Sequence, residues 1–170
     1  MESLQELLAE DKELSKIDSN IKGAIAETIA EEMFRAMGFE VRKYGQEFAV
    51  PGFGSREVPQ NGEAADVIRL MPDLVVTKDR QTFLLEVKYR ANGKFNLNEF
   101  VKSKKIDAYP YLYAYVVLFS PDHIKIQKAE DLIKGADFVY LDMHTDFKDF
   151  VDANIIKVYL RSCWKYFDTE

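Results

Sequence analysis

The sequence predicts an α/β fold in which a central mixed β-sheet is flanked by helices. Two observations indicate it: an amphipathic helical pattern covers residues 19–37, and strand-length apolar runs follow at 74–77, 83–89 and 113–119. A chain of 170 residues can bury a substantial core. We therefore expect a single domain over residues 1–170.

The first main helix is expected over residues 19–37, where Ala, Glu, Ile and Met dominate, with Gly38 as its terminator. At about 100° per residue, Ile21, Ile25 and Ile29 form one apolar stripe. Glu27 falls at the edge of this buried surface, so it can look inward. A short acidic helix is expected before it, over residues 3–15, and a strand after it, over residues 39–44.

The remaining elements follow from turn residues and apolar runs. Residues 45–65 predict a long loop or an open hairpin, and the turn 78–80 joins the strands 74–77 and 83–89. A helix over 96–108, capped by Asn96 or Asn98, leads to a central strand over 113–119. The expected C-terminal elements are a short helix at 129–134, a strand at 138–141 and a helix at 146–166.

Charged residues stand inside two of these apolar runs. Asp73 precedes the first, and Glu86 and Lys88 lie in the second, where a period of two places both on one face, opposite Leu85 and Val87. Buried charge is costly unless it is paired or binds a metal. Two carboxylates can hold Mg²⁺, and a nearby lysine can offset negative charge or help to activate water. An ion pair on a half-exposed strand is the alternative.

The pattern Pro72-Asp73 followed by Glu86-Val87-Lys88 resembles the PD-(D/E)XK nuclease superfamily, whose fold is restriction-endonuclease-like. The helix start Lys22-Gly23-x-x-x-Glu27 and its exit, Gly38-Phe39-x-Val41, look like the first helix of the archaeal Holliday-junction-resolvase branch. The resemblance implies the core order α-β-β-β-α-β over about residues 19–120, with a C-terminal extension over 121–170.

The resemblance also implies a metal-dependent phosphodiester hydrolase, a DNA endonuclease, with structure-selective cleavage as one form. Asp73, Glu86 and the main-chain carbonyl of Val87 would bind Mg²⁺ or Mn²⁺. Glu27 would join the metal directly or through water, and Lys88 would act on the attacking water. A catalytically silent nucleic-acid-binding or assembly module that keeps the fold is the alternative.

The net charge of −6 is unusual for a nucleic-acid enzyme, but residues 88–105 carry six basic residues and one acidic residue, a local balance of +5. Residues 105–109 have the spacing of the Gln-x-x-x-Tyr motif of RecB-like nucleases, with Lys in place of Gln. A solvated helix face is the alternative for these lysines. The candidates for contact with DNA are Arg90, Lys94, Lys102, Lys104, Lys105 and Tyr109.

Composition excludes several other classes of protein. No apolar run approaches the roughly 20 residues that span a bilayer, and the first residues lack the pattern of a signal peptide. A single cysteine, Cys163, excludes an internal disulfide framework and a cysteine-ligated zinc or iron–sulfur site. We therefore expect a cytoplasmic protein without a membrane partner. The aromatic residues of 138–166 predict a homodimer, with a monomer in which they cover the sheet as the alternative.

Overall fold

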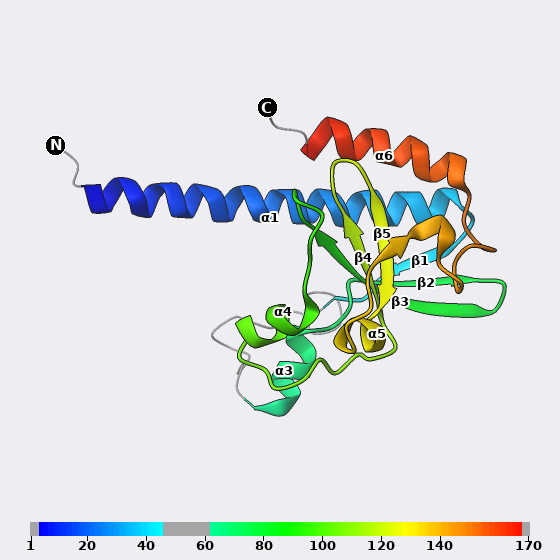
Figure 1. The fold of residues 1–170 in the computed structure, drawn as a ribbon, viewed down its shortest axis with the longest axis horizontal. Coiled ribbons are helices and arrows are strands. Elements are labelled where there is room, and N and C mark those ends of the chain that lie inside the picture. Colours follow the sequence, from blue (N-terminus) through cyan, green and yellow to red (C-terminus); the bar gives the residue numbers. More distant parts are fainter. Residues whose placement is uncertain (1–3, 46–61, 168–170) are drawn as a thin grey trace.

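The described part of the chain forms one six-stranded sheet with the strand order β1-β2-β3-β4-β5-β6 (Figure 1). This computed structural model describes residues 4–45 and 62–167. The strands β3 and β4 are parallel, and the other neighbouring pairs are antiparallel. The strands are β1 (Glu40–Lys43), β2 (Leu74–Lys78), β3 (Gln81–Tyr89), β4 (Tyr115–Phe119), β5 (Ile124–Lys128) and β6 (Val139–Tyr140).

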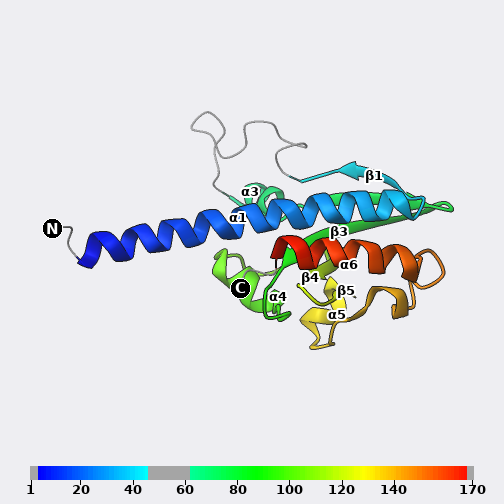
Figure 2. The same ribbon diagram turned by 90° about the horizontal axis from the view of Figure 1, so that it is seen from above.

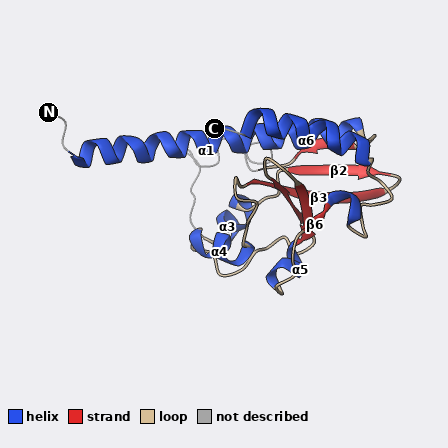
Figure 3. Cartoon of the chain, turned by 45° about the horizontal axis from the view of Figure 1, so that its top comes forward, coloured by secondary structure: helices blue, strands red, loops and turns tan. Residues whose placement is uncertain are grey.

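Helices cover both faces of this sheet (Figure 3). Two long helices, α1 (Leu4–Ala36) and α6 (Ala153–Phe167), lie side by side on one face. The short helices α3 (Glu63–Arg69), α4 (Leu97–Ser103) and α5 (Ala129–Ile133) lie on the other side, and a 3₁₀ turn covers Leu141–Met143. The mixed α/β sheet flanked by helices is therefore confirmed, with α1, β1, β2, β3, α4 and β4 in the predicted order.

The end of α1 follows the predicted glycine signal. Gly38 adopts a positive φ of 83°, and the amides of Gly38 and Phe39 donate to the carbonyls of Arg35 and Phe34 at 2.9 and 3.0 Å. These two bonds form a Schellman motif, which satisfies carbonyls at the helix end. The prediction of two separate helices over 3–15 and 19–37 was wrong, because no glycine or proline interrupts the segment between them and α1 continues through it.

Four other elements were either not expected or differ from their predicted bounds by more than two residues. The strand β5 was not expected, and α3 forms inside the segment expected to be a loop, most of which lies outside the described residues. The helix α4 ends at Ser103 rather than at 108, because Lys105 takes a left-handed φ of 58° that α-helix does not accept. The helix α6 begins at Ala153 rather than at 146, after a series of turns.

The two faces of β3 pack against two different hydrophobic clusters. Phe83, Leu85 and Val87 belong to the larger cluster, which they share with buried residues of α1 and α6. Leu84 instead packs against the smaller cluster, which includes Leu97 of α4. Glu86 and Lys88 share the parity of Leu84 and therefore face the α4 side of the sheet. The central strand β4 is buried at every residue, as its apolar run predicted.

The hairpin β2–β3 is fixed to the α1/α6 layer at its turn. The ammonium group of Lys78 donates to the carbonyl of Met37, which follows α1, at 2.7 Å. It also donates to the carbonyl of Phe150, which precedes α6, at 2.8 Å. Three distant segments of the chain thus meet at one side chain.

The turn of this hairpin carries backbone strain. Asp79 and Arg80 both have positive φ, at 50° and 66°, which a type I′ turn requires and glycine adopts most readily. We expect Arg80→Gly to raise the free energy of unfolding by about 1 kcal/mol, measured by urea denaturation. The control Arg80→Ala keeps the Cβ atom, so it should give no gain; an equal gain in both variants would show that relief of this strain is not the cause.

Candidate active site

Backbone pairing between β2 and β3 ends next to Asp73. The last paired residues are Leu74 and Leu85, so the same register places Asp73 opposite Glu86. Side chains of directly opposed residues point to the same face of a sheet, with Cβ atoms about 5 Å apart. The register therefore places Asp73 and Glu86 on the same face of the sheet where β2 ends, and the convergence of their carboxylates on one cation stays a prediction.

Proline determines how the ladder ends. In this register the residue opposite Val87 is Pro72, which has no amide hydrogen to donate to the Val87 carbonyl. The Val87 amide donates instead to Asp73 Oδ2 at 2.6 Å, so a side chain takes the place of the strand backbone. The Asp73 carbonyl accepts from the amides of Tyr44 and Gly45 at 2.8 and 3.3 Å. Asp73 is thus fixed through both its backbone and its side chain.

Glu86 is a charged residue in an almost fully enclosed position. It is 5% exposed, and its Oε1 accepts a hydrogen bond from the ammonium group of Lys88, two residues along the same face. Its other oxygen, Oε2, is buried and has no hydrogen-bond partner among the residues that the structure describes. A buried carboxylate oxygen left in this state is energetically costly and is suited to a cation.

The charges of the site perturb one another. Burial raises the pKa of Glu86, and the charge of Glu27 raises it further, while Lys88 and Lys104 oppose the shift. Burial acts to lower the pKa of Lys88, but the carboxylates of Glu86 and Asp73 outweigh it and hold that pKa above its usual value. Lys88 is therefore a firmly charged ammonium group beside two carboxylates.

Glu27 belongs to a different layer from Asp73 and Glu86. It lies half-buried on α1, whose buried neighbours Ala26 and Ala30 pack in the cluster on the opposite face of β3. Its charge nevertheless acts on Glu86. The structure thus places Glu27 close enough to influence Glu86 electrostatically, and its role as a metal ligand stays a prediction.

An aromatic ring of α4, Phe100, lies beside the charged groups of the site. The ring of Phe100 contacts two lysines, with Lys88 Nζ at 4.7 Å and Lys104 Nζ at 5.5 Å from its centroid. The cap predicted at Asn96 is present, because its side chain accepts from the Glu99 amide at 3.1 Å. Sequence reasoning missed Phe100, although its place three residues after Leu97 on an amphipathic helix indicated an inward direction.

The residues predicted to contact DNA differ in exposure. Arg90 is half-buried and donates to the Tyr89 carbonyl at 2.7 Å, with its guanidinium group 5.2 Å from the Phe95 ring, and burial lowers its pKa. The exposed lysines among the candidates are Lys94, Lys102, Lys104 and Lys105.

Tyr109 departs from the expectation of direct contact with DNA. It is only 3% exposed, so its ring is not presented to a nucleic acid. Burial raises the pKa of its hydroxyl group, and the charges of Glu86 and Asp73 raise it further. The hydroxyl is buried without a hydrogen-bond partner within residues 4–45 and 62–167. Tyr109 is therefore a buried neighbour of the carboxylates rather than a surface contact.

The donor atoms fit a hard divalent cation in kind. Carboxylate and main-chain carbonyl oxygens are the ligands that such cations prefer, and Glu86 Oε2 lacks another partner within the described ranges. The geometry is less complete, since the described residues contain no group of three or more His, Cys, Asp or Glu arranged to hold a metal. Asp73 and Glu86 form a pair, and Glu27 does not complete a triad with them.

Comparisons with known proteins add little. No protein-family model matches the chain. No curated protein matches it either. Among solved structures, the chain has a likeness to Hjc from Archaeoglobus fulgidus, a Holliday junction resolvase from an archaeal hyperthermophile, with 15% identity and a TM-score of 0.38. The match covers 78% of this chain and 97% of the other. A likeness of this size assigns neither family nor function.

Substitutions at Asp73 test how much its hydrogen bond with the Val87 amide contributes to stability. Asp73→Asn keeps an oxygen for the Val87 amide, so we expect its free energy of unfolding to stay within about 0.5 kcal/mol of the unmodified protein. Asp73→Ala leaves that amide unpaired and should cost about 1–3 kcal/mol. Chemical denaturation measures both, and equal stabilities for the two variants would show that the bond contributes nothing.

The pKa of Glu86 should respond in opposite directions to its two neighbours. Glu27→Gln removes a negative charge and should lower this pKa, whereas Lys104→Gln removes a positive charge and should raise it. Carboxyl carbon NMR titration of the metal-free protein reports both. The matched control Lys102→Gln, two residues before Lys104 and inside α4, should leave the titration unchanged, and shifts of the same sign in both test variants would contradict the assigned electrostatics.

Proposed function

We propose that the protein is a metal-dependent phosphodiester hydrolase that cuts DNA as an endonuclease. One observation carries the proposal: the buried Glu86 carboxylate has one oxygen held by Lys88 and the other without a partner in the described structure, and the register of β2 and β3, continued by one residue, sets Asp73 opposite it. A purely structural ion pair has no need of a second carboxylate at that position. A cation-binding site does.

The ligands proposed for Mg²⁺ or Mn²⁺ are Asp73, Glu86 and the Val87 carbonyl. Glu27 is the further ligand implied by the resemblance, directly or through water. A bound divalent cation would supply Lewis-acid stabilisation of charge on the scissile phosphate. The Val87 amide keeps Asp73 in place through its bond to Oδ2, which fixes the position of this carboxylate.

Lys88 is the residue proposed to act on the attacking water. Its ammonium group is charged and anchored to Glu86, so its donors are fixed near the carboxylates. From there it can orient a water molecule and offset negative charge that develops on a phosphate. Phe100 covers one side of this ammonium group and holds Lys104 nearby, which adds a second cation at the rim of the site.

The basic stretch that follows β3 is the proposed contact with the DNA backbone. The exposed lysines are Lys94, Lys102, Lys104 and Lys105, and the charge of Lys104 acts on Glu86. Phosphate contacts of this kind weaken steeply with salt. In the described ranges, no helix combines the length and the apolar character needed to cross a bilayer.

The decisive experiment is cleavage of labelled linear, branched and single-stranded DNA in the presence of Mg²⁺ or EDTA. We expect cleavage with Mg²⁺ only, and a loss of at least about 100-fold in Glu86→Gln and Lys88→Met, which remove the proposed ligand and the proposed water-orienting group. The control Lys148→Met removes an exposed lysine that precedes α6 and should retain activity.

A different result would support the catalytically silent module. In that case the unmodified protein would bind DNA but leave all three substrates intact with Mg²⁺ and with Mn²⁺. Cleavage that persists at full rate in Glu86→Gln would also overturn the proposed site, whatever its substrate.

A further inference from the structure

The first half of α1 projects beyond the body of the protein (Figures 1 and 2). We call residues 4–20 the arm. Every residue from 11 to 20 is exposed, including Leu14 at 61% and Ile17 at 49%, and Ile21 at the base of the arm is 54% exposed. At helical spacing these three side chains form one apolar stripe. A projecting helix with an uncovered apolar stripe gains stability only if another surface packs against it.

The borders of this stripe are acidic. At about 100° per residue, Asp11 and Asp18 flank it on one side and Glu13 on the other, while Lys12 and Lys16 lie on the opposite face of the helix. Asp18 also pairs with Lys22 at 3.0 Å. The sequence of residues 4–18 contains five acidic residues and two lysines, a balance of −3. The arm therefore suits an apolar partner surface with basic borders.

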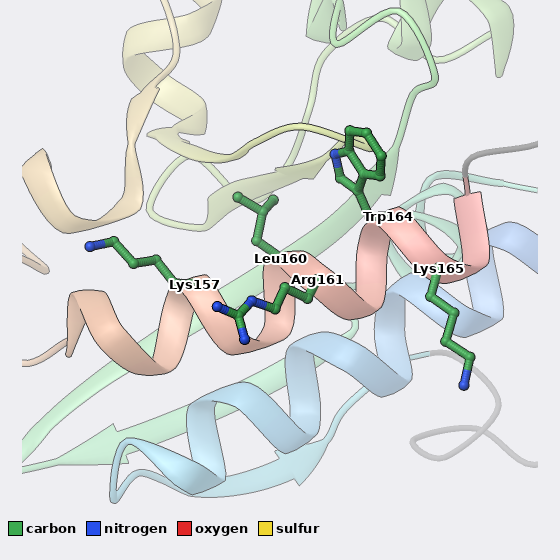
Figure 4. Close-up of a pocket in the computed structure, with 5 residues that line it drawn as sticks. All are labelled: Lys157, Leu160, Arg161, Trp164 and Lys165. Carbon is green, nitrogen blue, oxygen red and sulfur yellow. The ribbon is translucent and has the colours of Figure 1, made fainter.

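Such a surface exists on α6. Figure 4 shows a groove lined by side chains of this helix alone, with Leu160 and Trp164 as its apolar part, and Trp164 is 58% exposed. We call it the α6 groove. The sequence of α6 has no acidic residue and three basic ones, a balance of +3. The basic residues, all of which line the groove, are Lys157, Arg161 and Lys165.

The arm cannot reach the α6 groove of its own molecule. The helix α1 is continuous from Leu4 to Ala36, and the arm extends past the C-terminal end of α6 rather than folding back along it. Tyr166, near the end of α6, already lies beside Ile21 and Ile25, where the arm leaves the body of the protein. An occupant with the chemistry of the arm must therefore come from a second molecule.

We propose that the arm of one copy packs in the α6 groove of a second copy, and that the exchange is reciprocal. Leu14 and Ile17 would contact Leu160 and Trp164, and the acidic borders of the arm would face the cations of the groove. A reciprocal contact closes into a dimer with twofold symmetry. This refines the homodimer expected from residues 138–166: α6 supplies half of each interface, and the arm, outside that range, supplies the rest.

A charge-swap experiment tests the proposal in the full-length protein. The arm variant carries Asp11→Lys, Glu13→Lys and Asp18→Lys; the groove variant carries Lys157→Glu, Arg161→Glu and Lys165→Glu. By sedimentation equilibrium at micromolar concentration, the unmodified protein should have twice the 19.7 kDa chain mass, and each variant alone should dissociate at least about tenfold more readily. An equimolar mixture of the two variants should recover the dimer, because both interfaces then pair opposite charges.

Two controls separate loss of the interface from loss of the fold. Far-ultraviolet circular dichroism checks that each variant is folded, and recovery in the mixture itself requires folded partners. Trp164→Glu should weaken the dimer, whereas Tyr113→Glu, at a residue that is 77% exposed outside the interface, should not.

The proposal fails if the unmodified protein sediments as a single chain or if the mixed variants stay monomeric. If the unmodified protein is monomeric and the groove variant alone loses affinity for single-stranded DNA, then the α6 groove binds nucleic acid instead. These outcomes do not depend on DNA cleavage, so failure of the proposed nuclease function and failure of the dimer can be distinguished.

Discussion

The candidate site depends on the point where β2 stops pairing with β3 through its backbone. Proline at position 72 cannot donate to the strand opposite, and the carboxylate of Asp73 accepts the Val87 amide that would otherwise bond to a carbonyl. This substitution has two consequences. It positions one carboxylate beside Glu86, and it turns the end of a regular hairpin into a place where main-chain and side-chain oxygens gather.

The second helical layer gives this group of oxygens its electrostatic character. Burial raises the pKa of Glu86, and Lys88 and Lys104, which both contact the Phe100 ring, limit that effect. Tyr109 comes from the segment after α4 and adds a hydroxyl group that is buried among the same charges. Because Phe100, Lys104 and Tyr109 belong to the crossover between the parallel strands β3 and β4, this connection also covers the site.

Much of this arrangement could be predicted from the sequence, because it follows from local rules. A period of two places Glu86 beside Lys88, a turn over 78–80 joins the two strands, and the glycine at position 38 ends the first helix. What could not be predicted depends on distant contacts. Nothing local indicates that Tyr109 is buried, and the alternation of Ile124 and Ile126 in β5 is too short to distinguish a strand from a loop without its neighbour β4.

The two hydrogen bonds of Lys78 have a mechanical consequence. They join the turn of the hairpin to the end of α1 and to the segment before α6, while the other end of the same hairpin carries Asp73 and Glu86. The sheet therefore cannot slide along α1 without breaking the bond to Met37, or along the segment before α6 without breaking the bond to Phe150. As a result, α1, which is roughly 50 Å long, keeps a fixed orientation relative to the carboxylates of Asp73 and Glu86. A partner bound at the N-terminal end of α1 would therefore be held at a set distance from Asp73 and Glu86.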